Sequence, residues 1–383
     1  MLDYALKMLI NDRAKYVGIV MGITFASFII VQQSSIFVGL MLRTVGFIHD
    51  TPQPDIWVMD EKVQFIDDVK PLGDTQLFRV RGVEGVAWAV PLYKGILKAR
   101  LSSGNYQNCN IIGVDSATLI GAPPFMKEGN LLSLRDPDAI IIDHVGAEDK
   151  LSKDFPIRSE PLKVGDVIEI NDRRAVVEGI CNASRTFQSQ PVIYTTYNRA
   201  LNFAPNERKL LSFVLVKAKE GVDVRALAKK ISAQTGLKAF SSKDFIWLTI
   251  TYFMKYTGIP INFGIAVLLG FIIGTAIAGQ TFYNFTLDNL RYFATFRAMG
   301  APISLLRKMI LLQSFWVGAI GWGIGAGAAS IFGFLSKYSE LSFVLTWWLF
   351  LASMVAVGTI SAISSFVSLR KIKNVDPSIV FKS

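Results

Sequence analysis

Four stretches of this sequence contain no charged residue, and each is long enough to cross a lipid bilayer. They comprise residues 16–42, 256–287, 309–336 and 341–369. A spanning helix needs roughly 20 apolar residues, and an Arg or Lys near its centre costs about 3 kcal/mol. Buried helices of soluble proteins are usually shorter and carry a polar face, and the first stretch is too long for a signal peptide. The sequence therefore predicts four transmembrane helices.

The basic residues outside these spans indicate how the chain is oriented in the membrane. Residues 1–15, 288–308 and 370–383 together hold 11 Lys and Arg against 4 Asp and Glu. Because segments rich in Lys and Arg are retained in the cytoplasm, we expect these segments and both termini to be cytoplasmic. Residues 43–255 then lie on the opposite side. The net charge of +10 mostly reflects this topology, and no basic cluster on a soluble element indicates nucleic-acid binding.

The large segment between the first and second spans has the alternating strand and helix patterns of an α+β domain. Its first and last parts each have the pattern of a β-α-β half, and a strand-rich insertion separates them. We predict a split ferredoxin-like core at residues 50–114 and 207–240, with an inserted β-rich subdomain at residues 115–206. The predicted fold class is a membrane α-helical protein with four transmembrane helices plus an α+β extracytoplasmic domain. The expected strands are residues 55–59, 86–101, 106–114, 139–143, 164–170, 174–180, 192–197, 212–218 and 237–240.

Two further segments have patterns typical of the membrane interface. Residues 1–15 place four apolar side chains on one face of a helix, which we expect to lie along the inner leaflet with this face in the acyl boundary. Residues 245–254 are rich in aromatic side chains and are predicted to form an interfacial stalk before the second span. The four apolar residues of the first helix are Leu2, Leu6, Leu9 and Ile10.

The segment between the second and third spans, residues 288–308, has the pattern of a short amphipathic helix. Aromatic residues recur on one side, and Arg291 and Arg297 are placed to reach acidic partners. Gly300 is expected to end this helix, and Pro302 fits the opening of the next one. The helix either docks into a partner protein or lies on lipid headgroups, and periodicity does not separate the two. The candidate docking residues are Leu290, Arg291, Phe293, Phe296, Arg297, Met299, Gly300 and Ala301.

Three pairs of glycines are spaced four residues apart within the predicted spans. This spacing lets two helices approach closely in a membrane. Gly321, Gly323 and Ala326 also match a dinucleotide-binding fingerprint, but they lie in an uncharged span without a preceding strand, so we reject that match. The spacing leaves open whether the glycine faces pack within one chain or across a homodimer. The pairs are Gly270 with Gly274, Gly321 with Gly325, and Gly323 with Gly327.

Residues suited to catalysis or metal binding are sparse. Cys109 and Cys181 both lie in the extracytoplasmic segment, where they either pair as a disulfide or serve as two small buried hydrophobes. His49 and His144 are the only histidines, too few for the usual ligand set of a zinc site, so no metal site is predicted. The sequence has no phosphate-binding loop with its lysine, and we expect no catalytic residue and no cofactor bound by this chain. Any ATP hydrolysis would belong to a separate subunit.

Several segments resemble one permease superfamily in their order and spacing. They are residues 18–19, 22–26, 32–33, 164–170, 176–180, 290–301 and 376–381. Residues 290–301 are similar to the family's loop between the second and third helices, and residues 376–381 to its terminal motif. The chain as a whole resembles the MacB, LolC/LolE and FtsX superfamily of type VII ABC transporter permeases, and its first span resembles the DevC branch. Relatives commonly have a Glu where this chain has Tyr292.

The resemblance implies the permease subunit of an ABC export complex in a bacterial inner membrane. Two cytoplasmic ATPase subunits, which would bind ATP and Mg²⁺, are expected to dock on residues 288–308 of a permease homodimer. Closure of the ATPases would tilt the helices and move the periplasmic domain, which would push substrate into a periplasmic adaptor and an outer-membrane channel. This action is mechanotransmission. Lipoprotein extraction from the inner membrane and regulation of a periplasmic cell-wall hydrolase are the alternatives, whereas the short cytoplasmic segments argue against a sensor.

Overall fold

The computed structural model describes residues 2–153, 155, 160–205, 210–336 and 339–372, and these divide into two compact units. One unit comprises Met1–Leu40 with Gly258–Ser383, and the other comprises Met41–Thr257. The terminal motif at residues 376–381 and the predicted tail beyond residue 372 lie outside the described residues. Each unit has a hydrophobic core of its own.

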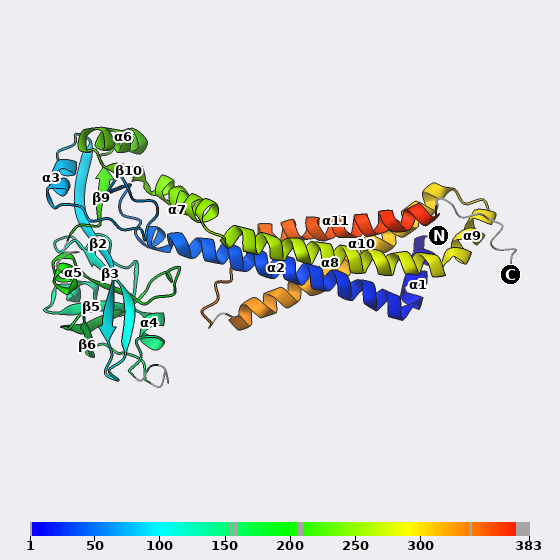
Figure 1. Ribbon diagram of the computed structural model, residues 1–383, viewed down its shortest axis with the longest axis horizontal. Coiled ribbons are helices and arrows are strands. Elements are labelled where there is room, and N and C mark those ends of the chain that lie inside the picture. Colours follow the sequence, from blue (N-terminus) through cyan, green and yellow to red (C-terminus); the bar gives the residue numbers. More distant parts are fainter. Residues whose placement is uncertain (1, 154, 156–159, 206–209, 337–338, 373–383) are drawn as a thin grey trace. The chain divides into compact units, whose positions relative to one another are not determined.

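The first unit is a bundle of long apolar helices (Figure 1). Its elements are α1 (Leu2–Asn11), α2 (Arg13–Asp50), α8 (Ile259–Asp288), α9 (Leu290–Ala298), α10 (Ile303–Leu335) and α11 (Trp347–Ile372). Among the described residues, α2, α8, α10 and α11 are long and apolar enough to cross a membrane, which confirms the four predicted spans. The 38 residues of α2 form one helix about 57 Å long, so α2 extends well beyond a hydrocarbon core of ~30 Å. The end of α2, from Met41 onward, belongs to the second unit.

Glycines on α8 allow this helix to pack closely against α2. A Cβ atom added at Gly274 would lie 2.3 Å from the Cβ atom of Ala26. One added at Gly270 would lie 2.9 Å from Cγ2 of Ile29. Both distances are shorter than non-bonded carbon–carbon contacts in proteins, so the two helices can touch only because these positions lack side chains. The predicted close packing of this glycine pair therefore occurs within the chain.

The two glycine pairs on α10 differ in their surroundings. Gly321 and Gly325 face α2, and a Cβ atom added at Gly325 would lie 2.5 Å from the carbonyl oxygen of Thr24. Nothing lies within 4 Å of a Cβ atom added at Gly323 or Gly327. One pair thus packs within the chain, while the other faces open space in the single chain.

α1 packs against protein instead of turning its apolar face to lipid. Ala5 and Leu9 are fully buried in the bundle core, whereas Ile10 is 50% exposed. The side-chain amide of Gln313 on α10 donates to the carbonyl oxygen of Ala5 at 2.7 Å. The prediction that Leu9 and Ile10 share a stripe in the acyl boundary is therefore wrong, because a polar side chain of α10 holds α1 on the bundle.

The second unit contains the predicted ferredoxin-like sheet. Its strands are β1 (Ile56–Met59), β2 (Val86–Arg100), β9 (Phe213–Ala218) and β10 (Lys238–Ser241). They lie in the order β10-β1-β9-β2 with antiparallel pairing throughout. The helices α3 (Thr75–Arg81) and α6 (Val224–Thr235) connect them as two β-α-β halves and cover one face (Figure 1). Trp57 lies at the centre of the other face, with its ring centroid 5.7 Å from those of Phe213 and Phe245.

The inserted strands close into a barrel. They are β3 (Tyr106–Val114), β5 (Ala139–Asp143), β6 (Val167–Ile170), β7 (Arg173–Asn182) and β8 (Val192–Thr196). The order around the barrel is β2-β3-β8-β5-β7-β6, and β6 pairs back to β2. A further strand, β4 (Phe125–Gly129), pairs with β7 outside this ring. The 15 residues of β2 serve both the sheet and the barrel, so β3 belongs to the barrel although the sequence places it in the core segment 50–114.

The two cysteines are free thiols in different cores. Cys109 on β3 lies in the barrel core, and Cys181 on β7 lies in the core around Trp57. Two strands, β8 and β5, separate β3 from β7. At a spacing of ~4.8 Å per strand the two Cα atoms are about 14 Å apart, beyond the ~7 Å that a disulfide spans. The disulfide alternative is therefore wrong, and burial raises the pKa of both thiols above its usual range.

The helix that precedes the second span packs along the extracytoplasmic domain. α7 (Ser242–Tyr256) contains the predicted stalk at residues 245–254. Phe245 and Phe253 are buried, whereas Trp247 is 67% exposed. One face of this segment therefore contributes to the domain core, and the other remains open.

The remaining short elements of the second unit are α4 (His144–Glu148), α5 (Tyr197–Phe203) and a 3-10 helix at Leu131–Arg135.

Candidate functional site

α9 is a short helix whose ends are defined by hydrogen bonds. At its start, the side chain of Asn289 donates to a carbonyl oxygen in the last turn of α8 at 2.9 Å. At its end, the amide of Ala301 donates to the carbonyl oxygen of Phe296, and that of Gly300 to the carbonyl oxygen of Arg297, both at 3.0 Å. This is the Schellman arrangement, and it requires the positive φ of 88° that Gly300 adopts. The predicted helix end at Gly300 is confirmed.

One face of α9 is buried in the bundle, and the opposite face is exposed. Phe293 is fully buried, and Phe296 packs partly against the same core. Tyr292 is 60% exposed and Met299 is 64% exposed. Phe293 therefore anchors α9 in the bundle and is not available to a partner. Of the other predicted docking residues, Arg291 and Gly300 are exposed, while Leu290, Arg297 and Ala301 are partly buried.

An ion-pair cluster at the same end of the bundle ties α2 to α8. Nζ of Lys15 lies 2.8 Å from Oδ2 of Asp12 and also pairs with Asp288, the last residue of α8. Sequence reasoning missed this cluster, although one basic and two acidic residues directly outside the predicted spans were its signal. Because solvent reaches all three side chains, the cluster adds little stability, but it fixes the start of α2 beside the end of α8.

Apart from Asp288, which pairs with Lys15, the exposed charges near α9 are basic. Arg291 lies on the outward face of α9, and Arg307 and Lys308 are exposed in the first turns of α10. The part of the chain that the structure describes has no cluster of three or more His, Cys, Asp or Glu that suits a metal ion. The outward face thus combines large apolar and aromatic contacts with a basic rim. This arrangement suits recognition of an acidic protein surface, which α9 would enter as a short helix in a groove.

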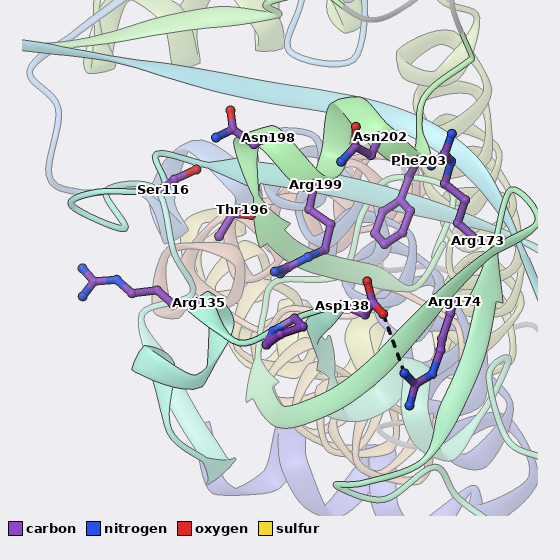
Figure 2. A pocket seen from close by; sticks show the side chains of 11 residues that line it. Ser116, Arg135, Asp138, Arg173, Arg174, Thr196, Asn198, Arg199, Asn202 and Phe203 are labelled. Atoms are coloured by element: carbon purple, nitrogen blue, oxygen red, sulfur yellow. Dashed lines mark ion pairs between the residues drawn. The ribbon is translucent and has the colours of Figure 1, made fainter.

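A second candidate site is a hollow of about 640 Å³ on the barrel, lined by arginines (Figure 2). Arg199 reaches into it from α5 and donates to the backbone carbonyls of Leu134, Asp136 and Ala139, at 2.6 to 3.0 Å. Arg174 pairs with Asp138 at 3.8 Å, and Arg135 donates to another backbone carbonyl at 2.6 Å. Burial lowers the pKa of the Arg199 guanidinium, and the charge of Asp138 opposes this shift. Because these guanidinium groups hold the local backbone, we assign the hollow a structural role.

The four long apolar helices and the separate α/β domain define a multi-pass membrane protein with a large domain outside the spans. Residues 17–234 match the family described as MacB-like periplasmic core domain, and residues 263–377 match the family described as FtsX-like permease C-terminal. The chain belongs to the FtsX-like permeases that carry a MacB-like periplasmic core domain. It is therefore a non-catalytic membrane subunit of the ABC transporter permease type.

Similar curated proteins are uncharacterized ABC transporter permeases. One from Mycobacterium tuberculosis is 23% identical over 320 residues, which cover 81% of this chain and 79% of the relative. One from Methanocaldococcus jannaschii is 24% identical over 205 residues, which cover 52% of this chain. The match spans 49% of that relative, about half its length.

Solved structures that are similar to part of this chain include two domains of ABC transporters. The periplasmic region of MacB from Actinobacillus actinomycetemcomitans has a TM-score of 0.38 at 16% identity, and the match covers 53% of this chain and 95% of that one. The extracellular domain of the noncanonic ABC-type transporter YknZ from Gram-positive bacteria has a TM-score of 0.36 at 13% identity. That match covers 49% of this chain and 99% of the solved one.

Proposed function

We propose that this chain is the permease half of an ABC export complex that works by mechanotransmission. The continuity of α2 carries the proposal. This one helix begins at the α9 end of the bundle, where Lys15 pairs with Asp288, and it finishes in the core of the extracytoplasmic domain, where Ile48 is buried. A displacement at the α9 end would therefore reach the domain without passing through a flexible linker. ATP would act by shifting the balance between two discrete arrangements of the bundle.

α9 is the proposed docking element for a separate ATPase subunit, which would bind ATP and Mg²⁺. Buried Phe293 fixes the helix to the bundle, so a force on the outward face would act on the spans. Tyr292 and Met299 offer the large side chains that are enriched at protein interfaces. Arg291 adds a positive charge for an acidic partner. Because Tyr292 replaces the Glu common in relatives, an aromatic contact would stand where relatives have a carboxylate.

The assembly that we propose contains two permease chains and two ATPase subunits in a bacterial inner membrane. Both termini and α9 would face the cytoplasm. The open space around Gly323 and Gly327 supports a homodimer, since a second helix could approach this face closely. A periplasmic adaptor and an outer-membrane channel follow from the resemblance of the first span to the DevC branch. Lipoprotein extraction and hydrolase regulation would use the same continuous helix and differ in what the extracytoplasmic domain holds.

Co-purification with a tagged candidate ATPase subunit tests the docking of α9. The double variant Tyr292→Ala, Met299→Glu removes one large contact and places a carboxylate on the exposed face. It should weaken the association at least about tenfold, because an interface leaves the carboxylate buried and unpaired. Phe125→Glu changes an apolar residue of similar exposure, 70%, in the extracytoplasmic domain and should leave the association unchanged. Wild-type association of the double variant would refute docking through α9.

A further inference from the structure

A cavity of about 630 Å³ lies where the ferredoxin-like sheet and the barrel separate. β2 pairs with β9 as far as Leu92 and with β3 from Tyr93 onward, so the two sheets diverge at this point. Ser212 stabilises the backbone of β2 where the two sheets diverge. Its hydroxyl accepts from the amide of Lys94 at 2.9 Å and donates to the carbonyl oxygen of Lys94 at 3.1 Å. The volume is within the range of small-molecule sites, ~300–1,000 Å³.

The floor of this cavity presents hydrogen-bond donors. Lys94 is 5% exposed, and its Nζ pairs with Asp67 and lies 3.4 Å from Oδ1 of Asn110. An ammonium group has three donors, so one remains for a ligand. Asn110 is 3% exposed, and its Nδ2 has no hydrogen-bond partner among the residues that the structure describes. An acceptor on a ligand would therefore find donors on both Lys94 and Asn110.

The walls of the cavity are aromatic and aliphatic. The ring of Phe253 on α7 lies 5.0 Å from that of Phe187 and 5.4 Å from that of Phe65, measured between centroids. Ile96 and Leu210 also line the cavity and are 49% and 36% exposed. Donors on the floor and apolar rings on the walls fit an amphipathic molecule with an acceptor at one end.

One wall is the loop at residues 184–190, which the end of α2 holds. The amide and the hydroxyl of Ser184 donate to the carboxylate of Asp50 at 2.6 and 2.8 Å. Arg43 donates to another hydroxyl of the loop at 3.1 Å. Gly46 permits this close packing, because a Cβ atom added there would lie 2.7 Å from the Cβ atom of Ser184. The helix that starts at the α9 end of the bundle thus also holds a wall of the cavity.

We propose that this cavity binds a small amphipathic molecule with a carboxylate or similar acceptor head. The head would contact Lys94 and Asn110, and an aromatic or short aliphatic body would lie against Phe187 and Phe253. Movement of α2 would shift the loop at residues 184–190 and change access to the cavity. This last step rests on the proposed export function, whereas binding does not and is measured without an ATPase or nucleotide.

Fluorescence anisotropy of dansylglycine, an anionic aromatic probe, tests binding to the full chain in lipid nanodiscs, with empty nanodiscs as the blank. The wild-type chain should bind the probe. Lys94→Met should weaken binding about 10- to 100-fold, the usual value of a hydrogen bond to a charged group. Lys98→Met removes an exposed charge from the same strand and should bind like wild type. Phe187→Ala keeps the pair between Lys94 and Asp67, so its expected loss of about tenfold tests the site even if Lys94→Met does not fold.

Two results would overturn the proposed site. One is no binding by the wild-type chain, and the other is equal binding by Lys94→Met and Lys98→Met. Tighter binding of dansylcadaverine, which carries the same ring with a cationic end, would overturn the acceptor head. Because ATPase co-purification is measured separately, none of these results bears on the docking of α9.

Discussion

Replacing Gly321 and Gly325 together by alanine should push α10 away from α2. The added Cβ atoms would lie 2.7 Å from Ile23 and 2.5 Å from the carbonyl oxygen of Thr24. Carbon atoms normally keep ~3.5–4.0 Å between them, and the atoms that the new methyl groups meet include backbone, which cannot rotate away. Overpacking costs about 1–3 kcal/mol per site, so the two substitutions should together cost about 2–6 kcal/mol.

The same helix supplies the control for this prediction. Gly323→Ala with Gly327→Ala also changes two glycines of α10, but nothing lies within 4 Å of the added atoms. In mixed micelles that dissociate the proposed homodimer, both double variants gain the same helix propensity, up to about 1 kcal/mol per glycine, so their difference isolates the packing cost within the chain. We expect the free energies of unfolding to differ by about 2–6 kcal/mol, measured by SDS titration in mixed micelles with helical circular dichroism.

The outcome separates three interpretations of these glycines. If the free energies of unfolding of the two double variants differ by less than about 1 kcal/mol, the close packing of α10 on α2 is refuted. A lower oligomeric state in the control variant than in wild type, measured by light scattering, would place Gly323 and Gly327 between two copies of the chain. An unchanged oligomeric state in the control would leave this pair without a packing role in assembly.

Two further predictions concern buried titratable groups of the extracytoplasmic domain. Burial raises the pKa of Asp143 to about 6, although two backbone amides donate to its carboxylate. Because the folded pKa lies above the unfolded pKa of ~3.9, the protonated side chain contributes to the free energy of unfolding. This contribution is complete below pH ~3.9 and is lost as the pH rises through about 6. The free energy of unfolding of wild type should fall by up to about 3 kcal/mol relative to Asp143→Asn between pH 4 and 6 in urea titrations, and an opposite trend would contradict the raised pKa. Cys109 and Cys181 are buried thiols, so a maleimide should label them only when the domain unfolds, and rapid labelling of the native chain would show that these cores are open.

Local sequence patterns were sufficient for elements that their own residues define. The predicted strands at residues 106–114 and 139–143 have the same bounds in the structure, because each is a short segment with several apolar residues and is flanked by turn residues. The spans were predictable for a similar reason, because a run of about 20 or more uncharged, mostly apolar residues is typical of a transmembrane helix. Gly300 ended α9 as expected, because only a residue tolerant of positive φ fits there.

The features that sequence reasoning missed depend on contacts between distant residues. β6 closes the barrel by pairing Ile170 with Ala99, and a strand pattern does not indicate its partner. Lys94 has the pattern of an ordinary polar position, but the divergence of the two sheets buries it. Phe293 and Phe296 both fall on the aromatic side of the predicted docking helix. Only packing against the bundle shows that Phe293 is the anchor.

The two connections between the spans and the extracytoplasmic domain differ in a way that favours transmission through α2. α2 passes from one unit to the other as one unbroken helix without a proline, the commonest cause of a kink. The return connection is interrupted, because α7 ends at extended Thr257 and α8 begins after Gly258 with a proline in its first turn. A tilt of α2 would therefore act directly on its terminal Asp50 and on the loop at residues 184–190, while the joint between α7 and α8 would absorb the change in angle.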